Sequence, residues 1–250
     1  MNSKSKSILT LIALLAGTAA MAQTKAPEPD YTLSYNVGVV SDYRFRGMAQ
    51  TSTKPALQAG VDFAHKSGFY LGAWGSNVSW IKDYAGATDG SLEIDLYGGY
   101  KGEISKDLTY DLGLITYQYP RNNAATNANT TEVYGALTYS VVTAKYSRST
   151  GNFLANPNSS GSGYIEVAAN FDLGNGFTLT PHMGRQYISN VANNAGDCND
   201  YALTLGKDFG NGLVATVAAV GTNADKPFYT DTKGKFLGKD ALVVGLKYSF

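Results

Sequence analysis

Alternation of apolar and polar residues is the dominant pattern of the chain from residue 31 to its end. Between residues 33 and 45 the odd positions are mostly apolar, and the even positions are mostly small or polar. Successive side chains of a β-strand point to opposite faces, so a period of two predicts a strand over this stretch. The predicted strand places Tyr43 and Phe45 on one face and Arg44 and Arg46 on the other.

The same period recurs along the rest of the chain, and no helical period is found. Clear alternation covers 57–63, 92–97, 108–114, 165–171, 201–206 and 242–250, and weaker alternation covers 69–80, 131–140, 141–149, 177–187 and 213–221. The pattern predicts about twelve strands of about ten residues, which is the length a tilted strand needs to cross a bilayer.

The connections between these strands alternate in length. Long segments such as TGNFLANPNSSGSG (150–163) follow or precede tight ones such as LGNG (173–176) and GNG (210–212). Asn-Gly pairs suit two-residue hairpins, which need positive φ. Sorting of long loops to one end and tight turns to the other is typical of outer-membrane barrels. We therefore predict an all-β fold, an antiparallel transmembrane β-barrel of about twelve strands with long extracellular loops and short periplasmic turns. A secreted or periplasmic β-sandwich is the alternative.

Aromatic residues give a second indication of the same architecture. On the predicted outward face they gather near the tight turns, as the interfacial girdle of a barrel does. The predicted lower girdle consists of Tyr35, Phe63, Phe69, Tyr100, Tyr110, Tyr139, Phe171, Phe177, Phe209, Tyr248 and Phe250. A sparser upper girdle is predicted from Phe45, Trp80, Tyr187 and Tyr201.

The two ends of the chain predict export and membrane assembly. Residues 1–22 combine Lys4 and Lys6 with a short apolar core and the small-x-small motif Ala20-Met21-Ala22, which indicates a cleaved signal peptide. Residues 23–30 form a short lead-in, and residues 31–250 form the predicted barrel. The final strand ends in Phe250, which resembles the signal read by the bacterial barrel-assembly machinery. We expect the protein in the bacterial outer membrane, in contact with its lipids.

Charge and cysteine content exclude several functions. Lys+Arg and Asp+Glu both total 20, so the chain lacks the basic excess that nucleic-acid binding requires. The single cysteine, Cys198, forms no intrachain disulfide and is expected to be an exposed thiol. The segment Asp197–Asp200 carries oxygen ligands but lacks a calcium-loop pattern, so a solvated loop is expected. No metal or cofactor is predicted.

Charged residues on the inward face are the candidate functional residues. Charges are costly on the lipid face, so they should point into the lumen. The predicted pore-lining residues are Asp42, Arg44, Arg46, Asp62, Glu93, Asp95, Asp111, Glu132, Glu166 and His182. Asp208, Lys101, Lys145 and Lys247 are also assigned inward. These charges either fill the barrel as a ladder of ion pairs or sort solutes by charge, and an acidic excess would favour cations.

One family resemblance adds to this prediction. The stretches NVGVVSDYRFRGMAQTSTKPALQAGVDFAHKSGFYLGAWGSNVSW (36–80) and EIDLYGGY (93–100) resemble the TorF family of porins. The resemblance implies a porin without a defined substrate. Our expectation is a channel for passive diffusion of small polar solutes or ions, without enzymatic activity. The alternative is a non-conducting barrel that acts through its loops as an enzyme or adhesin. For an enzyme, His65 and His182 lack a visible serine nucleophile.

Overall fold

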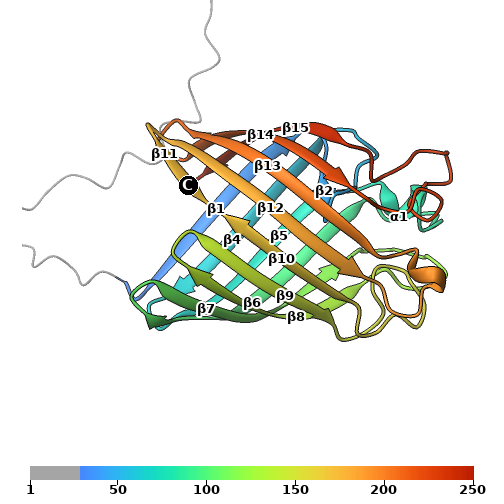
Figure 1. Ribbon diagram of the computed structural model, residues 1–250, viewed down its shortest axis with the longest axis horizontal. Coiled ribbons are helices and arrows are strands. Elements are labelled where there is room, and N and C mark those ends of the chain that lie inside the picture. The colour runs from blue at the N-terminus through green and yellow to red at the C-terminus, as the bar shows by residue number, and fades with distance from the viewer. Residues whose placement is uncertain (1–28) are drawn as a thin grey trace, which may run out of the picture. The chain divides into compact units, whose positions relative to one another are not determined.

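The computed structural model describes residues 29–250, which form a closed antiparallel β-barrel (Figure 1). Its strands are β1 (Tyr31–Val40), β4 (Ala56–His65), β5 (Phe69–Asn77), β6 (Leu92–Ser105), β7 (Leu108–Gln118), β8 (Thr130–Tyr139), β9 (Val142–Ser149), β10 (Gly163–Ala169), β11 (Phe171–Gly174), β12 (Phe177–Tyr187), β13 (Cys198–Asp208), β14 (Leu213–Thr222) and β15 (Ala241–Ser249). Strands β10 and β11 both pair with β12 and together occupy one position, so the wall has twelve strands. The predicted fold class is confirmed.

Pairing of the first and last strands closes the barrel. The register runs from Asn36 opposite Ser249 to Val40 opposite Gly245, so no edge strand is left unpaired. The chain ends beside the start of β1, where Tyr35 and Phe250 exchange backbone hydrogen bonds of 2.9 Å. Their rings stack at 5.8 Å, and Phe250 also stacks on Tyr248.

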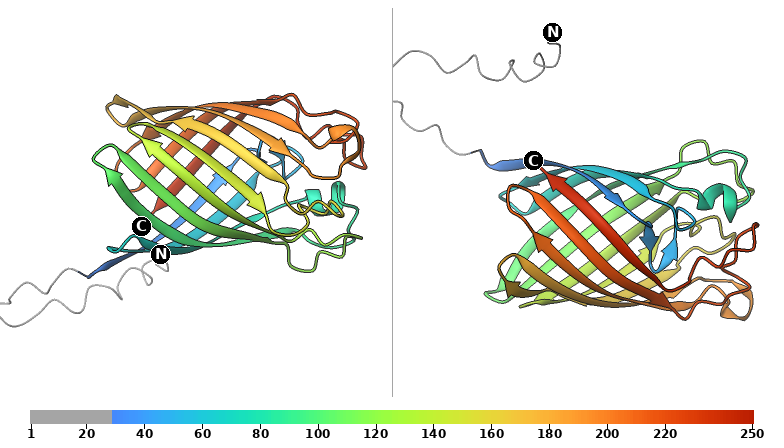
Figure 2. Two further views of the ribbon diagram at one scale, coloured as in Figure 1. Left: turned by 60° about the horizontal axis from the view of Figure 1, so that its bottom comes forward. Right: turned by 90° about the horizontal axis from the view of Figure 1, so that it is seen from above.

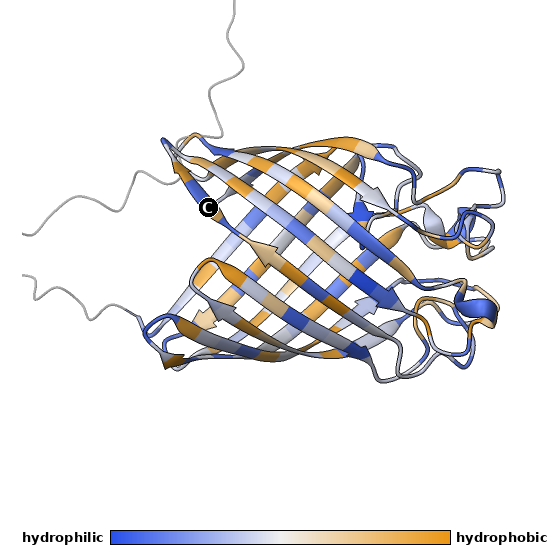
Figure 3. Cartoon of the chain, in the orientation of Figure 1, coloured by the Kyte–Doolittle hydropathy of each residue, from blue (hydrophilic) through white to orange (hydrophobic). Residues whose placement is uncertain are grey.

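The two faces of the wall differ as the alternation predicts. Large apolar side chains point outward and remain exposed, including Leu57, Met183 and Leu242 at 62–73%. Polar and small side chains point inward, and Figure 3 shows apolar and polar residues alternating along the strands. Within residues 29–250 no helix is long and apolar enough to cross a membrane.

The loops are sorted by length, as predicted. One end of the barrel carries only the tight turns 66–68, 106–107, 140–141, 175–176 and 209–212. Asn175 and Gly176 both have positive φ, 52° and 75°, which the two-residue turn requires. The other end carries the long loops 41–55, 78–91, 119–129, 150–162, 188–197 and 223–240 (Figure 2). We call these two ends the tight-turn end and the long-loop end.

The long loops pack into a cap, and the buried apolar residues of the described chain gather there. One cluster centres on Trp80, Ile81 and Tyr119, and a second contains Ala49, Cys198, Tyr229 and Leu237. A barrel filled with polar side chains has no apolar core of its own, so its loops supply one.

Three predictions about individual segments are wrong. The predicted strand 33–45 is too long, because β1 ends at Val40 and the chain then forms a short hairpin of β2 (Arg44–Phe45) and β3 (Met48–Ala49). Strand β5 ends at Asn77, so the stretch 69–80 is too long as well, and Trp80 begins the short helix α1 (Trp80–Asp83). Phe45 and Trp80 pack inside the cap and are not part of an upper girdle.

The prediction for Cys198 is also wrong. It begins β13 rather than lying in a solvated loop, and its side chain is 2% exposed. The expected exposed thiol is therefore a buried one, 4.0 Å from the hydroxyl of Tyr229. The predicted signal peptide and most of the lead-in lie outside the described residues.

Candidate functional site

The hairpin of residues 42–49, which contains β2 and β3, enters the barrel from the long-loop end. It turns at Arg46 and Gly47, which have φ of 48° and 79°. A Cβ on Gly47 would overlap the methyl group of Thr222 and lie 2.9 Å from Cβ of Asp200. Only glycine fits at this point, and the tip of the hairpin therefore rests directly against β13 and β14.

Arg46 ties the hairpin to the opposite part of the wall. Its Nη2 lies 2.7 Å from Oε2 of Glu132 on β8, and its Nη1 donates to Oε1 of Gln186 on β12 at 2.6 Å. The guanidinium also lies 4.2 Å from the ring centroid of Tyr164. Both charged side chains are almost fully buried, at 9% and 1% exposed. Arg46 therefore links the hairpin to β8 and β12, which are separated in the wall by β9 and β10.

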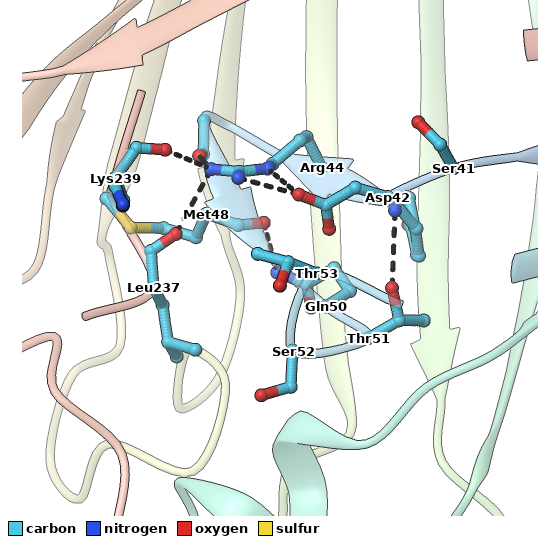
Figure 4. Close-up of polar contacts among 12 residues, drawn as sticks. Ser41, Asp42, Arg44, Met48, Gln50, Thr51, Ser52, Thr53, Leu237 and Lys239 are labelled. Atoms are coloured by element: carbon cyan, nitrogen blue, oxygen red, sulfur yellow. Dashed lines mark hydrogen bonds and ion pairs between the residues drawn. The ribbon is translucent and has the colours of Figure 1, made fainter. Parts of the chain in front are cut away.

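Arg44 fixes the hairpin to the last long loop (Figure 4). Its Nε and Nη2 meet Oδ2 of Asp42 at 2.7 and 2.6 Å. Its Nη1 donates to the carbonyl oxygens of Gly47, Leu237 and Lys239 at 3.0, 3.2 and 2.8 Å. Among the described residues, the guanidinium of Arg44 thus bonds only to groups of its own hairpin and of the last long loop, and it holds these two segments together.

Aromatic side chains of the hairpin contact the wall at β5, β6 and β7. Tyr43 donates its hydroxyl to Oε1 of Glu93 at 3.0 Å, and its ring packs edge-on against Trp74. Phe45 packs edge-on against Tyr117 at 5.3 Å. Glu93 is 1% exposed beneath these rings, and its neighbour Asp95 is 7% exposed. The hairpin therefore contacts the wall from β5 round to β14.

Below the hairpin lies a cavity of about 360 Å³. Its roof is formed by Arg44, Phe45, Arg46 and Gly47, and its walls by Tyr117, Lys145, Tyr164, Glu166, His182, Asp200, Ala202, Thr204, Ala218 and Val220. Nε2 of His182 lies 3.1 Å from Glu166, and Nδ1 lies 3.6 Å from Asp200. Lys145 lies 3.7 Å from the same glutamate. One side of the cavity is ionic and the other is lined by small side chains.

A second, apolar chamber of about 60 Å³ lies among the long loops. Its lining includes Met48, Trp80, Phe153, Phe228 and Leu237. Phe45 and Arg46 line both this chamber and the larger cavity. These two side chains therefore form the partition between the loop cap and the barrel interior.

The lumen toward the tight-turn end carries tyrosine–carboxylate pairs. Tyr97 donates to Asp62 at 2.5 Å, and Tyr70 donates to Asp111 at 2.6 Å while also contacting the hydroxyl of Tyr134. The Tyr70 ring covers Gly99, where a Cβ would meet ring Cζ at 2.8 Å. The missing side chain lets this ring lie along the wall rather than across the lumen.

The cap is fastened by a contact between α1 and the last long loop. Lys233 Nζ lies 2.5 Å from Asp83 Oδ1, and the backbone N–H of Thr232 donates to the carbonyl oxygen of Asp83 at 2.8 Å. Burial opposes ionisation of Asp83. The hydrogen bond from Lys233, together with the other hydrogen bonding and the positive charges of Lys233 and Lys54, outweighs it and holds the pKa of Asp83 below its usual range.

The structure places the predicted pore-lining residues in three settings. Asp62, Asp111, Glu166 and His182 contact one another or neighbouring inward side chains below the hairpin. Glu93, Asp95 and Glu132 point inward but are buried behind the hairpin. Asp42, Arg44 and Arg46 lie on the hairpin itself, so their predicted position on the wall of the first strand is corrected.

Sequence reasoning missed Asp200 and Tyr164, which share the cavity with His182. The hydroxyl of Tyr164 donates to Asp200 at 3.0 Å. Alternation over 201–206, extended back by one period, would have placed Asp200 in phase with the inward residues Ala202 and Thr204. Among residues 29–250 no group of three or more His, Cys, Asp or Glu side chains could hold a metal ion.

Comparisons with known proteins agree with this architecture. A family model described as a bacterial protein of unknown function (Gcw_chp) matches residues 24–250. The solved structure of the KdgM porin in complex with disordered oligogalacturonate aligns with a TM-score of 0.56 and 8% identity, over 87% of this chain and 98% of that one. The NanC porin aligns with the same TM-score and identity, over 87% and 99%. At this identity the likeness shows the fold alone. No curated protein matches the sequence.

Proposed function

The chain belongs to the Gcw_chp family of bacterial proteins of unknown function, and we propose that it is an outer-membrane channel for passive diffusion of small polar solutes or ions. The hairpin of residues 42–49 is its constriction. The observation that carries the proposal is the partition formed by Phe45 and Arg46, which separates a polar cavity in the barrel from the loop cap. A polar barrel interior narrowed by an inserted loop fits a narrow channel, because pore diameter and the lining groups decide which solutes pass.

The remaining expectations fit this proposal. The signal peptide over residues 1–22 would direct export, and Phe250 would be read by the barrel-assembly machinery. The loops would face the cell exterior and the tight turns the periplasm. The resemblance of 36–80 and 93–100 to the TorF porins supports the same function, as does the porin fold of the structural neighbours.

The solute class differs from that suggested by the KdgM complex, which holds an anionic oligosaccharide. Arg44 and Arg46, at the cavity roof, are neutralised by Asp42 and Glu132. In the walls, Lys145 is outnumbered by Glu166 and Asp200. The interior therefore favours neutral or cationic solutes, and a polyanion is a poor fit.

The packing of the cap favours a second candidate, a non-conducting barrel that acts through its loops. The apolar chamber among the loops holds only about 60 Å³, and Arg46 is bound on both sides. If the hairpin never moves, solutes have no passage past it, and the loops would be the functional surface, as an adhesin or an enzyme.

Planar-bilayer conductance of the purified protein tests both candidates. Gly47→Ala would push the hairpin away from Thr222 and Asp200, so we expect larger single-channel currents than in the wild type. Gly86→Ala is the matched control, because Gly86 also has a positive φ, of 72°, but a Cβ there would meet nothing within 4 Å. Stable insertion without current in all three proteins would favour the loop function. Equal currents in all three would show that the hairpin is not the constriction.

A further inference from the structure

Two arginines lie on the outward face of the barrel near the long-loop end. Arg148 is the next-to-last residue of β9, and Arg185 lies two residues before the end of β12. Only β10 separates them, because Arg148 pairs with Gly163, and Ile165 on the same strand pairs with Arg185. Strand spacing and rise place their Cα atoms about 12 Å apart. Two long side chains at this separation can reach one headgroup.

These are the only cations on outward-facing strand positions in the long-loop half of the described barrel. No described strand presents a carboxylate outward beside them. Lys207, the comparable outward cation, lies at the opposite end, 4.6 Å from the ring centroid of Phe177. The positive charge on the outer wall is therefore confined to one small area at this level.

The two guanidinium groups are poorly neutralised by the protein. Arg148 has no acidic partner among residues 29–250, and its guanidinium lies beside Gly161 of the loop. Arg185 donates to Oδ1 of Asn199 at 3.2 Å and lies 3.8 Å from Asp197, with its side chain 46% exposed. The area keeps a net positive charge, and both arginines are exposed.

The surroundings place both arginines at the edge of the apolar belt. The outward side chains Ile165, Val167 and Met183, which are in register with Arg185 or nearer the tight-turn end, are 40–62% exposed. Around them, Tyr187 is in register with Arg148, Tyr146 with Arg185, and Tyr201 with Met183. Aromatic rings mark the depth of lipid headgroups in membrane proteins. An outward arginine is costly at mid-bilayer but is tolerated at this depth, where phosphate groups lie.

We propose that Arg148 and Arg185 form a binding site for the phosphorylated headgroup of an outer-leaflet lipid, of the kind carried by lipopolysaccharide. Guanidinium groups bind phosphate oxygens in bidentate fashion, and the apolar belt beneath would receive the acyl chains. This proposal rests on the outer-membrane location proposed above, but not on conductance.

Binding of purified, detergent-solubilised barrel to lipid A tests the site. Arg148→Gln with Arg185→Gln should weaken binding about 30-fold, since each basic residue at a membrane surface contributes about 1 kcal/mol. Lys207→Gln removes the same kind of charge at the other end and should bind lipid A as the wild type does. Heat-modifiable gel mobility confirms that each variant is folded.

Lipid A from which the phosphates have been removed should bind the wild type as weakly as intact lipid A binds the double variant. Equal affinity of all three proteins for lipid A would overturn the proposal. So would binding of the wild type to the dephosphorylated form as tightly as to intact lipid A. Inorganic phosphate that competes at low concentration would overturn the assignment to a lipid. If the protein conducts but does not bind lipid A, the lipid site is refuted and the channel function stands. If it binds lipid A but does not conduct, the channel function is refuted and the lipid site stands.

Discussion

Nη2 of Arg46 lies 2.7 Å from Oε2 of Glu132, and this ion pair joins the tip of an inserted hairpin to the wall of the barrel at β8. Glu132 is fully buried, and within residues 29–250 the only other hydrogen bond to this oxygen comes from the hydroxyl of Tyr117, at 3.3 Å. The counter-ion of a wall residue is therefore supplied by a loop. Movement of that loop must either carry the charge pair apart or expose it to water.

Loss of Arg46 should destabilise the barrel. Arg46→Met leaves the carboxylate of Glu132 buried without a cation, and removal of one partner from a buried pair costs about 3–5 kcal/mol. Urea unfolding followed by heat-modifiable gel mobility should show a lower midpoint for this variant. Arg46→Met combined with Glu132→Gln should recover most of the loss, because no unpaired charge remains.

Arg121 provides the control for this measurement. It pairs with Asp89 at 3.5 Å, but its side chain is 80% exposed. Arg121→Met should therefore change the free energy of unfolding by less than about 1 kcal/mol. A double variant at Arg46 and Glu132 that is no more stable than Arg46→Met would show that the ion pair is not the source of the effect.

The barrel itself could be predicted from sequence because the residues of each strand alternate between an apolar outer face and a polar or small inner face. Outward residues such as Leu242 and Val244 are apolar and exposed, while the alternate residues Val243 and Gly245 point inward. The tight turns at Asn175-Gly176 and Asn211-Gly212 fix the pairing of neighbouring strands through local backbone preference. Both signals are local, and local signals can be read from one sequence.

The hairpin could not be predicted, because its position depends on contacts with distant residues and not on local signals. Tyr43 and Phe45 alternate with Asp42 and Arg44 whether the apolar face meets lipid or other loops, so the period of two is unchanged. What distinguishes the hairpin is contact with distant residues, such as Arg46 with Glu132 and Gly47 with Thr222. The positive φ of Arg46 interrupts the strand, and an arginine does not by itself predict a positive φ.

Acidification should loosen the cap at the contact between Asp83 and Lys233. The pKa of Asp83 is lowered in the folded protein, so its bond to Lys233 contributes stability above the ordinary carboxyl pKa of about 4. That contribution is lost as the pH falls through the lower, folded-state pKa. Hydrogen exchange at residues 229–237, corrected for its intrinsic pH dependence, should therefore be faster at pH values below about 4.

Lys233→Gln is the control for this pH effect. It should raise exchange of the same residues at neutral pH and remove most of the dependence on acid. The effect should be modest, because Lys233 is exposed and the hydrogen bonds from Thr232 to the carbonyl oxygen of Asp83 do not titrate. An unchanged pH dependence in this variant would assign the loosening to another group.

Charge selectivity should depend on carboxylates that face the cavity and not on those behind the hairpin. Glu166 and Asp200 line the cavity, whereas Glu93 and Asp95 are buried and Glu93 accepts a hydrogen bond from Tyr43 of the hairpin. A charge exposed to the path of an ion acts on it directly, and a low-dielectric wall strengthens that field. Glu166→Gln with Asp200→Asn should therefore move the reversal potential in a salt gradient toward anion preference.

Glu93→Gln with Asp95→Asn is the matched comparison, since it makes the same chemical change on the same inner wall. In this variant the reversal potential should stay close to the wild-type value while the hairpin is in place. Combined with Gly47→Ala, which displaces the hairpin, the same pair should shift the reversal potential, because the two carboxylates would then face the lumen. Equal shifts from both pairs in the otherwise wild-type protein would mean that the hairpin does not cover Glu93 and Asp95 in the conducting state.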